Sequence, residues 1–219
     1  MTQDLTPRVV VLISGRGTNL QALIEAQQAG ELHGTIQAVF SDRIDAPGLE
    51  RARRSDIDAR HIDPADFDDD AAFDAALVRE ILACEPSLVV LAGFMRILGP
   101  SFVETFHGRM LNIHPSLLPR FKGLDTHRRV LRAGEHIHGA TVHFVTTDLD
   151  GGPNVIQYRI PIRPDDTATS LKARVSQGEH IVLPRAVGWF AEQRLRLADG
   201  AVMLDGRHLI QPVRVEGEA

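Results

Sequence analysis

The sequence has very little cysteine, with Cys84 as the single thiol among 219 residues. One cysteine excludes an internal disulfide framework and a metal site made of cysteines alone, and it is typical of a reducing compartment. An apolar run of the roughly 20 residues needed to cross a bilayer is also missing. The first residues, MTQDLTPR, lack the basic start and apolar stretch of a secretory signal. We therefore expect a cytoplasmic protein with no membrane contact.

An excess of positive charge is missing as well. The 24 Lys and Arg residues face 29 Asp and Glu residues, which gives a formal net charge of −5 and argues against nucleic acid as a partner. None of the ten histidines forms a His-Glu-x-x-His motif or a Cys/His pair at ligand spacing, so we expect no metal. A Gly-x-Ser-x-Gly nucleophile motif is absent too. With 43% hydrophobic and 24% charged residues, the composition is that of a folded globular protein.

The first half of the chain alternates between two patterns. Apolar runs typical of buried strands lie at 9–13, 36–40, 59–62 and 88–91, and helical patterns lie between them at 20–28, 49–54 and 71–84. Strands that alternate with helices form right-handed βαβ units. The N-terminal half is therefore predicted to be α/β with a Rossmann-like parallel sheet.

The second half has a different rhythm. A short strand at 110–114 runs into a proline-rich loop, a helix is expected around 130–132, and a longer helical pattern at 167–191 is expected to be interrupted or bent near Pro184. Turn residues between the runs 140–146 and 155–160 predict an antiparallel hairpin, and 195–197, 202–204 and 208–210 are expected as small edge strands. We therefore expect antiparallel strands to extend the parallel sheet. Because no repeat or linker is found, we predict one domain over 1–219, with halves of about 8–114 and 115–211.

A glycine-containing loop, Gly15-Arg16-Gly17-Thr18-Asn19, follows the first strand and precedes the first helix. Glycines allow the backbone to approach an anion, and the free N–H groups at a helix start can hold a phosphate. The loop is neither a dinucleotide fingerprint nor a Walker loop. A simple tight turn therefore stays open as the alternative.

Three polar residues lie at strand ends or in turns of the second half. Asn112 and His114 are two positions apart, so alternation places both on the same side of their strand. An amide donor beside an imidazole suits a reaction that develops an oxyanion while a proton moves. Asp150, on a glycine-flanked turn, could orient that imidazole. The plain alternatives are a turn cap, a rim histidine and a hairpin turn.

These segments, together with Ala92-Gly-Phe-Met-Arg-Ile-Leu98, resemble the phosphoribosylglycinamide formyltransferase family of folate-dependent enzymes from about residue 9 to 211. The resemblance implies transfer of a formyl group from 10-formyltetrahydrofolate, as co-substrate, to the amine of phosphoribosylglycinamide in purine biosynthesis. It implies direct acyl transfer through a tetrahedral intermediate and small-molecule substrates. The half at about 8–114 would bind the nucleotide, and the half at about 115–211 would serve folate and catalysis.

The resemblance also implies a role for each matching residue. Catalysis would fall to Asn112, His114 and Asp150, ribotide binding to Gly17, Thr18, Asn19 and Glu179, and folate binding to Met95, Arg96, Ile97 and Leu98. Three positions depart from the family pattern. Arg16 replaces a small polar residue, Lys122 stands where proline is common, and Asp70 falls where a basic folate contact is common.

Other activities stay open beside this one. A formyltetrahydrofolate hydrolase shares the chemistry but usually has a further domain before the catalytic half, whereas the first strand here begins by residue 9. A methionyl-tRNA formyltransferase would need an added carboxy-terminal domain, for which we expect the chain to be too short. A non-catalytic nucleotide-binding regulator would keep the glycine loop but would not need Asn112, His114 and Asp150 together. Either a monomer or a homodimer is compatible with the sequence.

Overall fold

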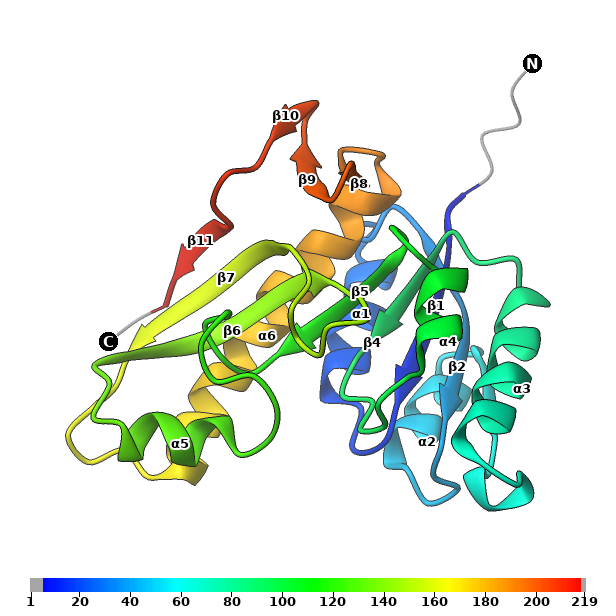
Figure 1. Cartoon of the computed structure of the whole chain (residues 1–219), viewed down its shortest axis with the longest axis horizontal. Coiled ribbons are helices and arrows are strands. Elements are labelled where there is room, and N and C mark those ends of the chain that lie inside the picture. The colour runs from blue at the N-terminus through cyan, green and yellow to red at the C-terminus, as the bar shows by residue number, and fades with distance from the viewer. Residues whose placement is uncertain (1–5, 218–219) are drawn as a thin grey trace.

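The structure, a computed structural model, describes residues 6–217. Its strands are β1 (Arg8–Ile13), β2 (Thr35–Ser41), β3 (Asp58–His61), β4 (Leu88–Leu91), β5 (Met110–His114), β6 (Ile137–Phe144), β7 (Asn154–Pro161), β8 (Leu195–Ala198), β9 (Ala201–Leu204), β10 (Arg207–His208) and β11 (Val213–Glu216). Its helices are α1 (Thr18–Gln28), α2 (Pro47–Arg54), α3 (Asp70–Leu82), α4 (Pro100–Thr105), α5 (Thr126–Arg132) and α6 (Ala168–Ala191), with a 3₁₀ turn at Pro64–Asp66. Figure 1 shows how these elements are arranged.

Eight strands form one sheet in the order β11-β7-β6-β5-β4-β1-β2-β3. The five strands from β3 to β5 are parallel, β6 runs antiparallel to both β5 and β7, and β11 pairs in parallel with β7. A parallel sheet extended by antiparallel strands is the fold class that the sequence predicts, and it is confirmed. A second, three-stranded antiparallel sheet (β8 to β10) follows α6 at the top of Figure 1.

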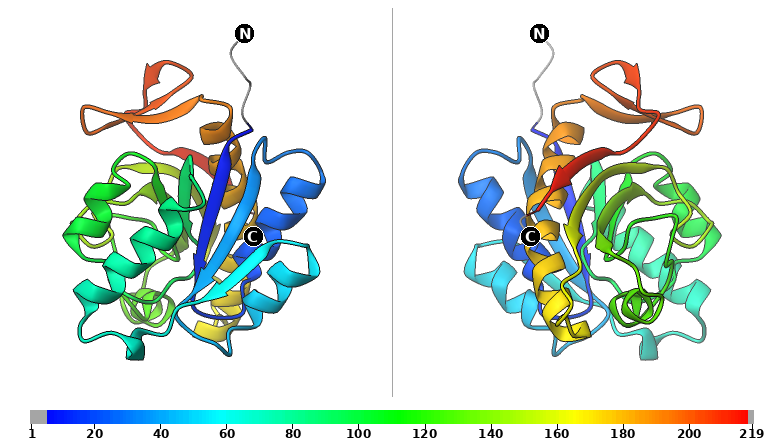
Figure 2. Two further views of the ribbon diagram at one scale, coloured as in Figure 1. Left: turned by 90° about the vertical axis from the view of Figure 1, so that its right-hand side faces the viewer. Right: turned by 90° about the vertical axis from the view of Figure 1, so that its left-hand side faces the viewer.

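Helices cover both faces of the large sheet (Figure 2). In β1, Val9, Val11 and Ile13 pack into a core that α1, α2 and α6 share, while Val10 and Leu12 pack under α3 and α4. All five side chains are 0% exposed, which explains why β1 is apolar at every position rather than alternating. Among residues 6–217, no helix has the length and hydropathy that a bilayer-spanning segment requires.

Two elements escape the sequence-based prediction, and one prediction is wrong. Helix α4 is only six residues long, which is too short to show a helical period. Strand β11 is four residues long, and it owes its extended form to pairing with the edge of β7. The edge strand expected at 208–210 ends at His208 instead, and Ile210 is 86% exposed between β10 and β11.

The strand order changes direction beside β1, and we call the space between the loops that follow β1 and β4 the crevice. From β1 the chain continues to β2, which lies next to β1 on one side within the sheet. It later enters β4, which lies next to β1 on the other side. At such a switch point the loops that follow the two neighbouring strands diverge, and open α/β sheets bind ligands there. Here these loops are 14–17 after β1 and 92–99 after β4.

Candidate functional site

The start of α1 forms one wall of the crevice. Gly17 adopts a left-handed φ of 68°, and a Cβ at this position would lie 2.7 Å from the Cα of Gly48. A larger residue is therefore both strained and sterically blocked. No side chain among residues 6–217 caps the start of α1. The first N–H groups of the helix, beginning at Thr18, are thus available to an anion.

Asn19 and Glu179 lie together beside that helix start. The Asn19 side-chain amide donates to Glu179 Oε2 at 2.9 Å, although 160 positions separate the two residues. The Oδ1 atom of Asn19 is buried and has no hydrogen-bond partner within the described chain. Burial raises the pKa of Glu179, and the hydrogen bond from Asn19 opposes this shift. The pair thus offers acceptor atoms to a ligand that carries hydroxyl or amine donors.

The segment after β4 forms the opposite wall. Ser14 joins the two walls, because its N–H donates to the Gly93 carbonyl at 3.1 Å and its Oγ accepts from the Met95 N–H at 2.8 Å. Met95 and Ile97 are 65% and 74% exposed. Leu98 instead packs partly against the core beneath α3 and α4. Two exposed apolar side chains beside a polar loop suit a flat apolar ligand.

Helix α3 holds the end of this segment. The guanidinium of Arg96 lies 4.8 Å from the centre of the Phe73 ring and forms an ion pair with Asp70. Asp74 accepts a 2.7 Å hydrogen bond from the Gly99 N–H, and burial raises the pKa of its carboxyl group. Asp70, one of the three departures noted in the sequence, is therefore a direct partner of Arg96.

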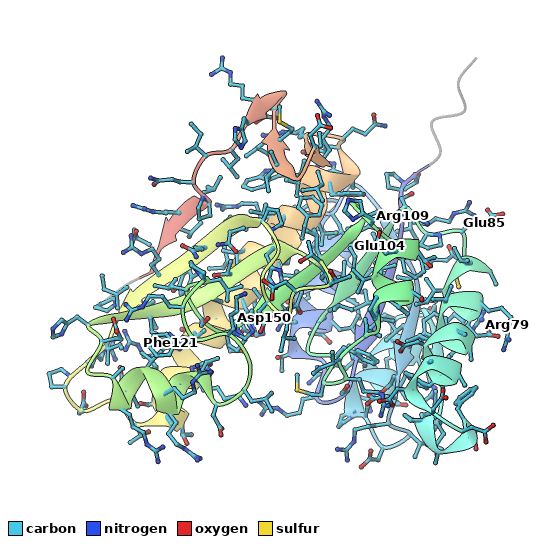
Figure 3. All side chains as sticks on the ribbon, in the orientation of Figure 1. Arg79, Glu85, Glu104, Arg109, Phe121 and Asp150 are labelled. Carbon is cyan, nitrogen blue, oxygen red and sulfur yellow. The ribbon has the colours of Figure 1, made fainter. Side chains whose placement is uncertain are left out.

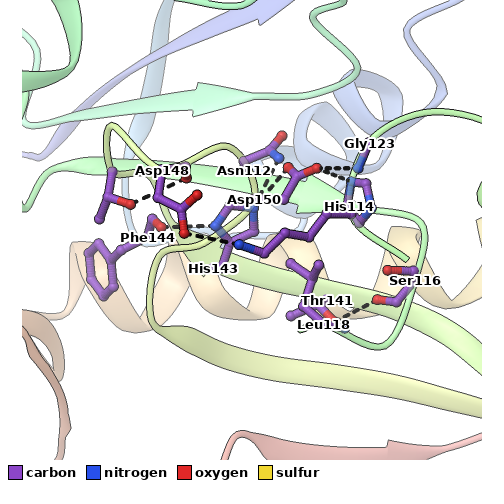
Figure 4. Close-up of polar contacts among 12 residues, drawn as sticks. Asn112, His114, Ser116, Leu118, Gly123, Thr141, His143, Phe144, Asp148 and Asp150 are labelled. Carbon is purple, nitrogen blue, oxygen red and sulfur yellow. Dashed lines mark hydrogen bonds and ion pairs between the residues drawn. The ribbon is translucent and has the colours of Figure 1, made fainter. Parts of the chain in front are cut away.

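Asn112 is oriented by a buried histidine on the neighbouring strand. In the pairing of β5 with β6, Asn112 lies opposite His143, and their Nδ2 and Nε2 atoms are 3.1 Å apart (Figure 4). His143 Nδ1 lies 2.8 Å from the Phe144 carbonyl and must donate to it, and burial lowers the pKa of His143 and keeps the ring neutral. Nε2 is then the acceptor, so Asn112 donates one N–H to it, and no acceptor within residues 6–217 takes its second N–H.

His114 lies between two acceptors. Its Nδ1 is 3.3 Å from Asp150 Oδ2, and its Nε2 is 3.0 Å from the Phe121 carbonyl oxygen. The two side chains of the ion pair are only 8% and 9% exposed. Gly123 donates its N–H to Asp150 at 2.8 Å, and Asp150 Oδ1 is 3.7 Å from His143 Nε2. Asn112, His114, His143 and Asp150 thus form one connected cluster (Figure 4).

Two loops enclose this cluster. Figure 3 shows Asp150 and Phe121 in front of the sheet, far from the outer residues of α3. Both residues have a positive φ, 48° for Asp150 and 58° for Phe121, a backbone conformation that costs energy for non-glycine residues and is often found at functional sites. Lys122, another departure from the family pattern, forms a 3.0 Å ion pair with Asp148 that joins the loops.

Sequence reasoning missed His143, although a signal was available. The run 140–146 was expected to be a strand, and an antiparallel partner of 110–114 in the right register would have placed a histidine opposite Asn112. No group of three or more His, Cys, Asp and Glu side chains within residues 6–217 is arranged to hold a metal ion. The cluster of Asn112, His114, His143 and Asp150 itself supplies an amide donor, imidazoles and a carboxylate.

Comparisons with known proteins agree on one family. Residues 7–187 match the family model described as formyl transferase. A phosphoribosylglycinamide formyltransferase of Escherichia coli K12 is 49% identical over 201 residues, which are 92% of this chain and 95% of that protein. Among solved structures, the phosphoribosylglycinamide formyltransferase of Coxiella burnetii has a TM-score of 0.90 at 50% identity and covers 95% of this chain and 98% of its own. A formyltetrahydrofolate deformylase of Pseudomonas putida KT2440 has a TM-score of 0.81 at 30% identity, over 93% of this chain and 72% of its own.

Proposed function

The chain belongs to the formyl transferase family, and we propose that it transfers a formyl group from 10-formyltetrahydrofolate to the amine of phosphoribosylglycinamide. The products are formylglycinamide ribotide and tetrahydrofolate, in de novo purine biosynthesis. The observation that carries the proposal is the connected cluster of Asn112, His114 and Asp150 at the same edge of the sheet as the open start of α1. The cluster can then catalyse acyl transfer to the amine of the same substrate whose phosphate binds at the start of α1.

The reaction is a direct attack of the ribotide amine on the formyl carbon, with no covalent enzyme intermediate. The attack places negative charge on the formyl oxygen of a tetrahedral intermediate. The N–H of Asn112 that His143 does not use donates to this oxygen. Because His143 fixes the amide before the reaction, the donor needs little reorganisation when the charge develops.

His114 and Asp150 handle the proton that the attacking amine must lose. The neutral imidazole of His114 takes the proton that the amine loses during the attack, and the carboxylate of Asp150 compensates the charge of the ring once it carries both protons. The proton then passes to the folate nitrogen as the carbon–nitrogen bond to the formyl group breaks. Removal from solvent strengthens this ion pair and orients the imidazole.

The ribotide is held by the wall around α1. Its phosphate accepts from the N–H groups of Gly17, Thr18 and Asn19, where the helix end is positive. Its hydroxyl groups donate to Asn19 Oδ1 and to Glu179, which supplies the buried acceptor with a partner. Arg16 is exposed at the same loop and adds a cation there.

The folate lies against the wall after β4. Met95 and Ile97 expose apolar surface for the pteridine and its aromatic linker, and Leu98 supports the segment from the core. Arg96 supplies the cation for the glutamate end. The backbone of the loop 146–150 completes the pocket on the side of Asp150.

We further propose that residues 1–219 act as one domain in the cytoplasm. The continuous eight-stranded sheet joins the two halves, and the single thiol of Cys84 is compatible with a reducing compartment. The substrates are small molecules. The protein acts as a monomer or as a homodimer, and analytical ultracentrifugation measures which of the two is present in solution.

The experiment that tests the function compares acceptors. The purified protein is incubated with 10-formyltetrahydrofolate, and the absorbance of released folate is followed with phosphoribosylglycinamide, with tRNA, or with water alone. We expect release that depends on phosphoribosylglycinamide. Equal release in water would instead indicate the hydrolase, the second candidate, which the likeness to the Pseudomonas putida deformylase favours. Binding of the ribotide without any release would indicate a regulator.

A further inference from the structure

Arg96 is the one charged residue in the segment 92–98, and it is already paired within the chain. Its Nη2 atom donates to Asp70 Oδ1, and its guanidinium lies over the Phe73 ring at 4.8 Å. The two partners differ in exposure, because the Asp70 side chain is 82% exposed whereas that of Arg96 is 28% exposed. The carboxylate of Asp70 therefore stands at the surface, directly beside the guanidinium of Arg96.

The wall keeps its shape without Asp70. Phe73 holds the guanidinium through a cation–π contact, Asp74 holds the Gly99 N–H, and Ser14 holds the Met95 N–H. Exposed ion pairs such as that of Asp70 contribute little to stability, since solvent screens them and two side chains must be ordered. Asp70 also lies in the first turn of α3, where an acid interacts favourably with the helix dipole, but neither this position nor the exposed ion pair accounts for what Asp70 does to a ligand of Arg96.

The electrostatic consequence concerns the ligand. A carboxylate that approaches Arg96 meets a cation whose charge Asp70 already offsets and one of whose donors Asp70 already occupies. We propose that Asp70 is a specificity-determining residue that competes with the glutamate carboxylates of the folate for Arg96 and so weakens binding of the co-substrate. The proposal rests on the function proposed above and adds to it.

The competition predicts a dependence on the length of the glutamate tail. Every glutamate adds a negative charge, and each charge within about 10 Å of Asp70 is repelled at ordinary ionic strength. The penalty should thus be absent for a folate without glutamate, present for one glutamate and larger for three. A role of Asp70 in merely holding Arg96 in place predicts the opposite sign, because loss of the acid would then weaken binding.

The test uses Asp70→Asn in the full chain, with the uncharged carboxamide of 10-formyltetrahydropteroate (the pteroate compound) and with 10-formyltetrahydrofolate carrying one or three glutamates. We expect the KM for the monoglutamate to fall about three- to fivefold at low salt, as for one charge removed at a few ångströms in water. The fall should be larger for the triglutamate, absent for the pteroate compound and smaller in added salt. Asp68→Asn is the matched control, because Asp68 is an exposed acid of the same stretch, outside both walls of the crevice.

Several results would overturn the proposal. A KM that rises or stays constant in Asp70→Asn would do so, and so would an equal fall for the pteroate compound or for Asp68→Asn. The thermal midpoint of both variants shows that they fold. If the wild-type chain transfers no formyl group, the proposed function fails, and calorimetry with tetrahydrofolate mono- and triglutamate still tests Asp70 by the same comparison.

Discussion

Strand β6 carries a histidine on each face, and the two have different surroundings. His138 and His143 are five positions apart, are 1% and 2% exposed, and both have a lowered pKa because burial disfavours the charged ring. His143 faces Asn112 and Asp150. His138 faces another histidine instead, with its Nε2 3.0 Å from His127 Nδ1 of α5.

The difference shows that burial alone does not make a histidine functional. The His127–His138 pair has no carboxylate partner among the described residues, and its pKa values are lowered to about 4 and about 3. One ring donates to the other, which satisfies both without any charge. His143 is equally buried, yet its free nitrogen orients an amide whose second N–H stays unused. We therefore assign the reaction to the face of β6 that carries His143.

The largest test of this assignment is Asn112→Ala. The variant removes the N–H that we assign to the oxyanion, and loss of one such donor typically lowers kcat by about 10² to 10³. The measurement is the absorbance change on folate release with phosphoribosylglycinamide as acceptor. A normal thermal midpoint serves as the control for folding. A kcat close to that of the wild-type protein would contradict the role of Asn112.

A smaller effect is expected for His143→Ala, which removes the group that orients Asn112. The donor then stays but is less fixed, so we expect kcat to fall by about 10-fold, less than for the loss of the donor itself. In the Asn112→Ala background the same change should have almost no further effect, since the two residues act as a unit. Additive losses in this double-mutant cycle would show that His143 acts separately.

The sequence was informative where one strand determines the outcome by itself. The apolar run at 9–13 predicts a strand buried on both faces, and Asn112 and His114 were expected on one side of their strand, as the pairing of β5 with β6 now places them. Where the outcome depends on contacts between distant strands, the sequence was less informative. The burial of His138 is an example, because His127 on α5 and the packing around it bury the ring, and no local sequence pattern indicates this contact.

Charge partners were the least predictable feature. Asp70, Arg16 and Lys122 could be recognised as unusual, but their partners could not be deduced from spacing. The ion pairs Arg96–Asp70 and Lys122–Asp148 each join residues 26 positions apart on separate elements. The paired Asn19 and Glu179 are 160 positions apart. Which of the many charged residues form ion pairs depends on the tertiary structure, and spacing along the sequence does not indicate it.

The free energy of unfolding should depend on pH through His127 and His138, on the face of β6 that does not carry His143. The unfolded chain binds protons on His127 and His138 below a pKa of about 6.5, whereas the folded chain binds them only near 4 and 3. The free energy of unfolding should therefore fall as the pH decreases from 6.5 towards 4, by up to about 1.4 kcal/mol per pH unit for each group. Urea unfolding at pH 7, 6 and 5 should show a shallower fall for His127→Gln. Parallel curves for the two proteins would contradict the linkage.

The smallest effect is expected from the ion pair between Lys122 and Asp148, which joins the two loops that enclose the cluster. Lys122→Met removes the ion pair with Asp148, whose side chains are 36% and 71% exposed. Such exposed pairs contribute up to about 1 kcal/mol. The neighbouring Gly123 N–H still holds Asp150, so kcat should fall by no more than about fivefold, and Lys122→Arg should restore it. An equal loss in Asp148→Asn, not increased in the double variant, would show that the pair itself is responsible. The reactive face would then depend on contacts between loops, whereas the opposite face depends on burial.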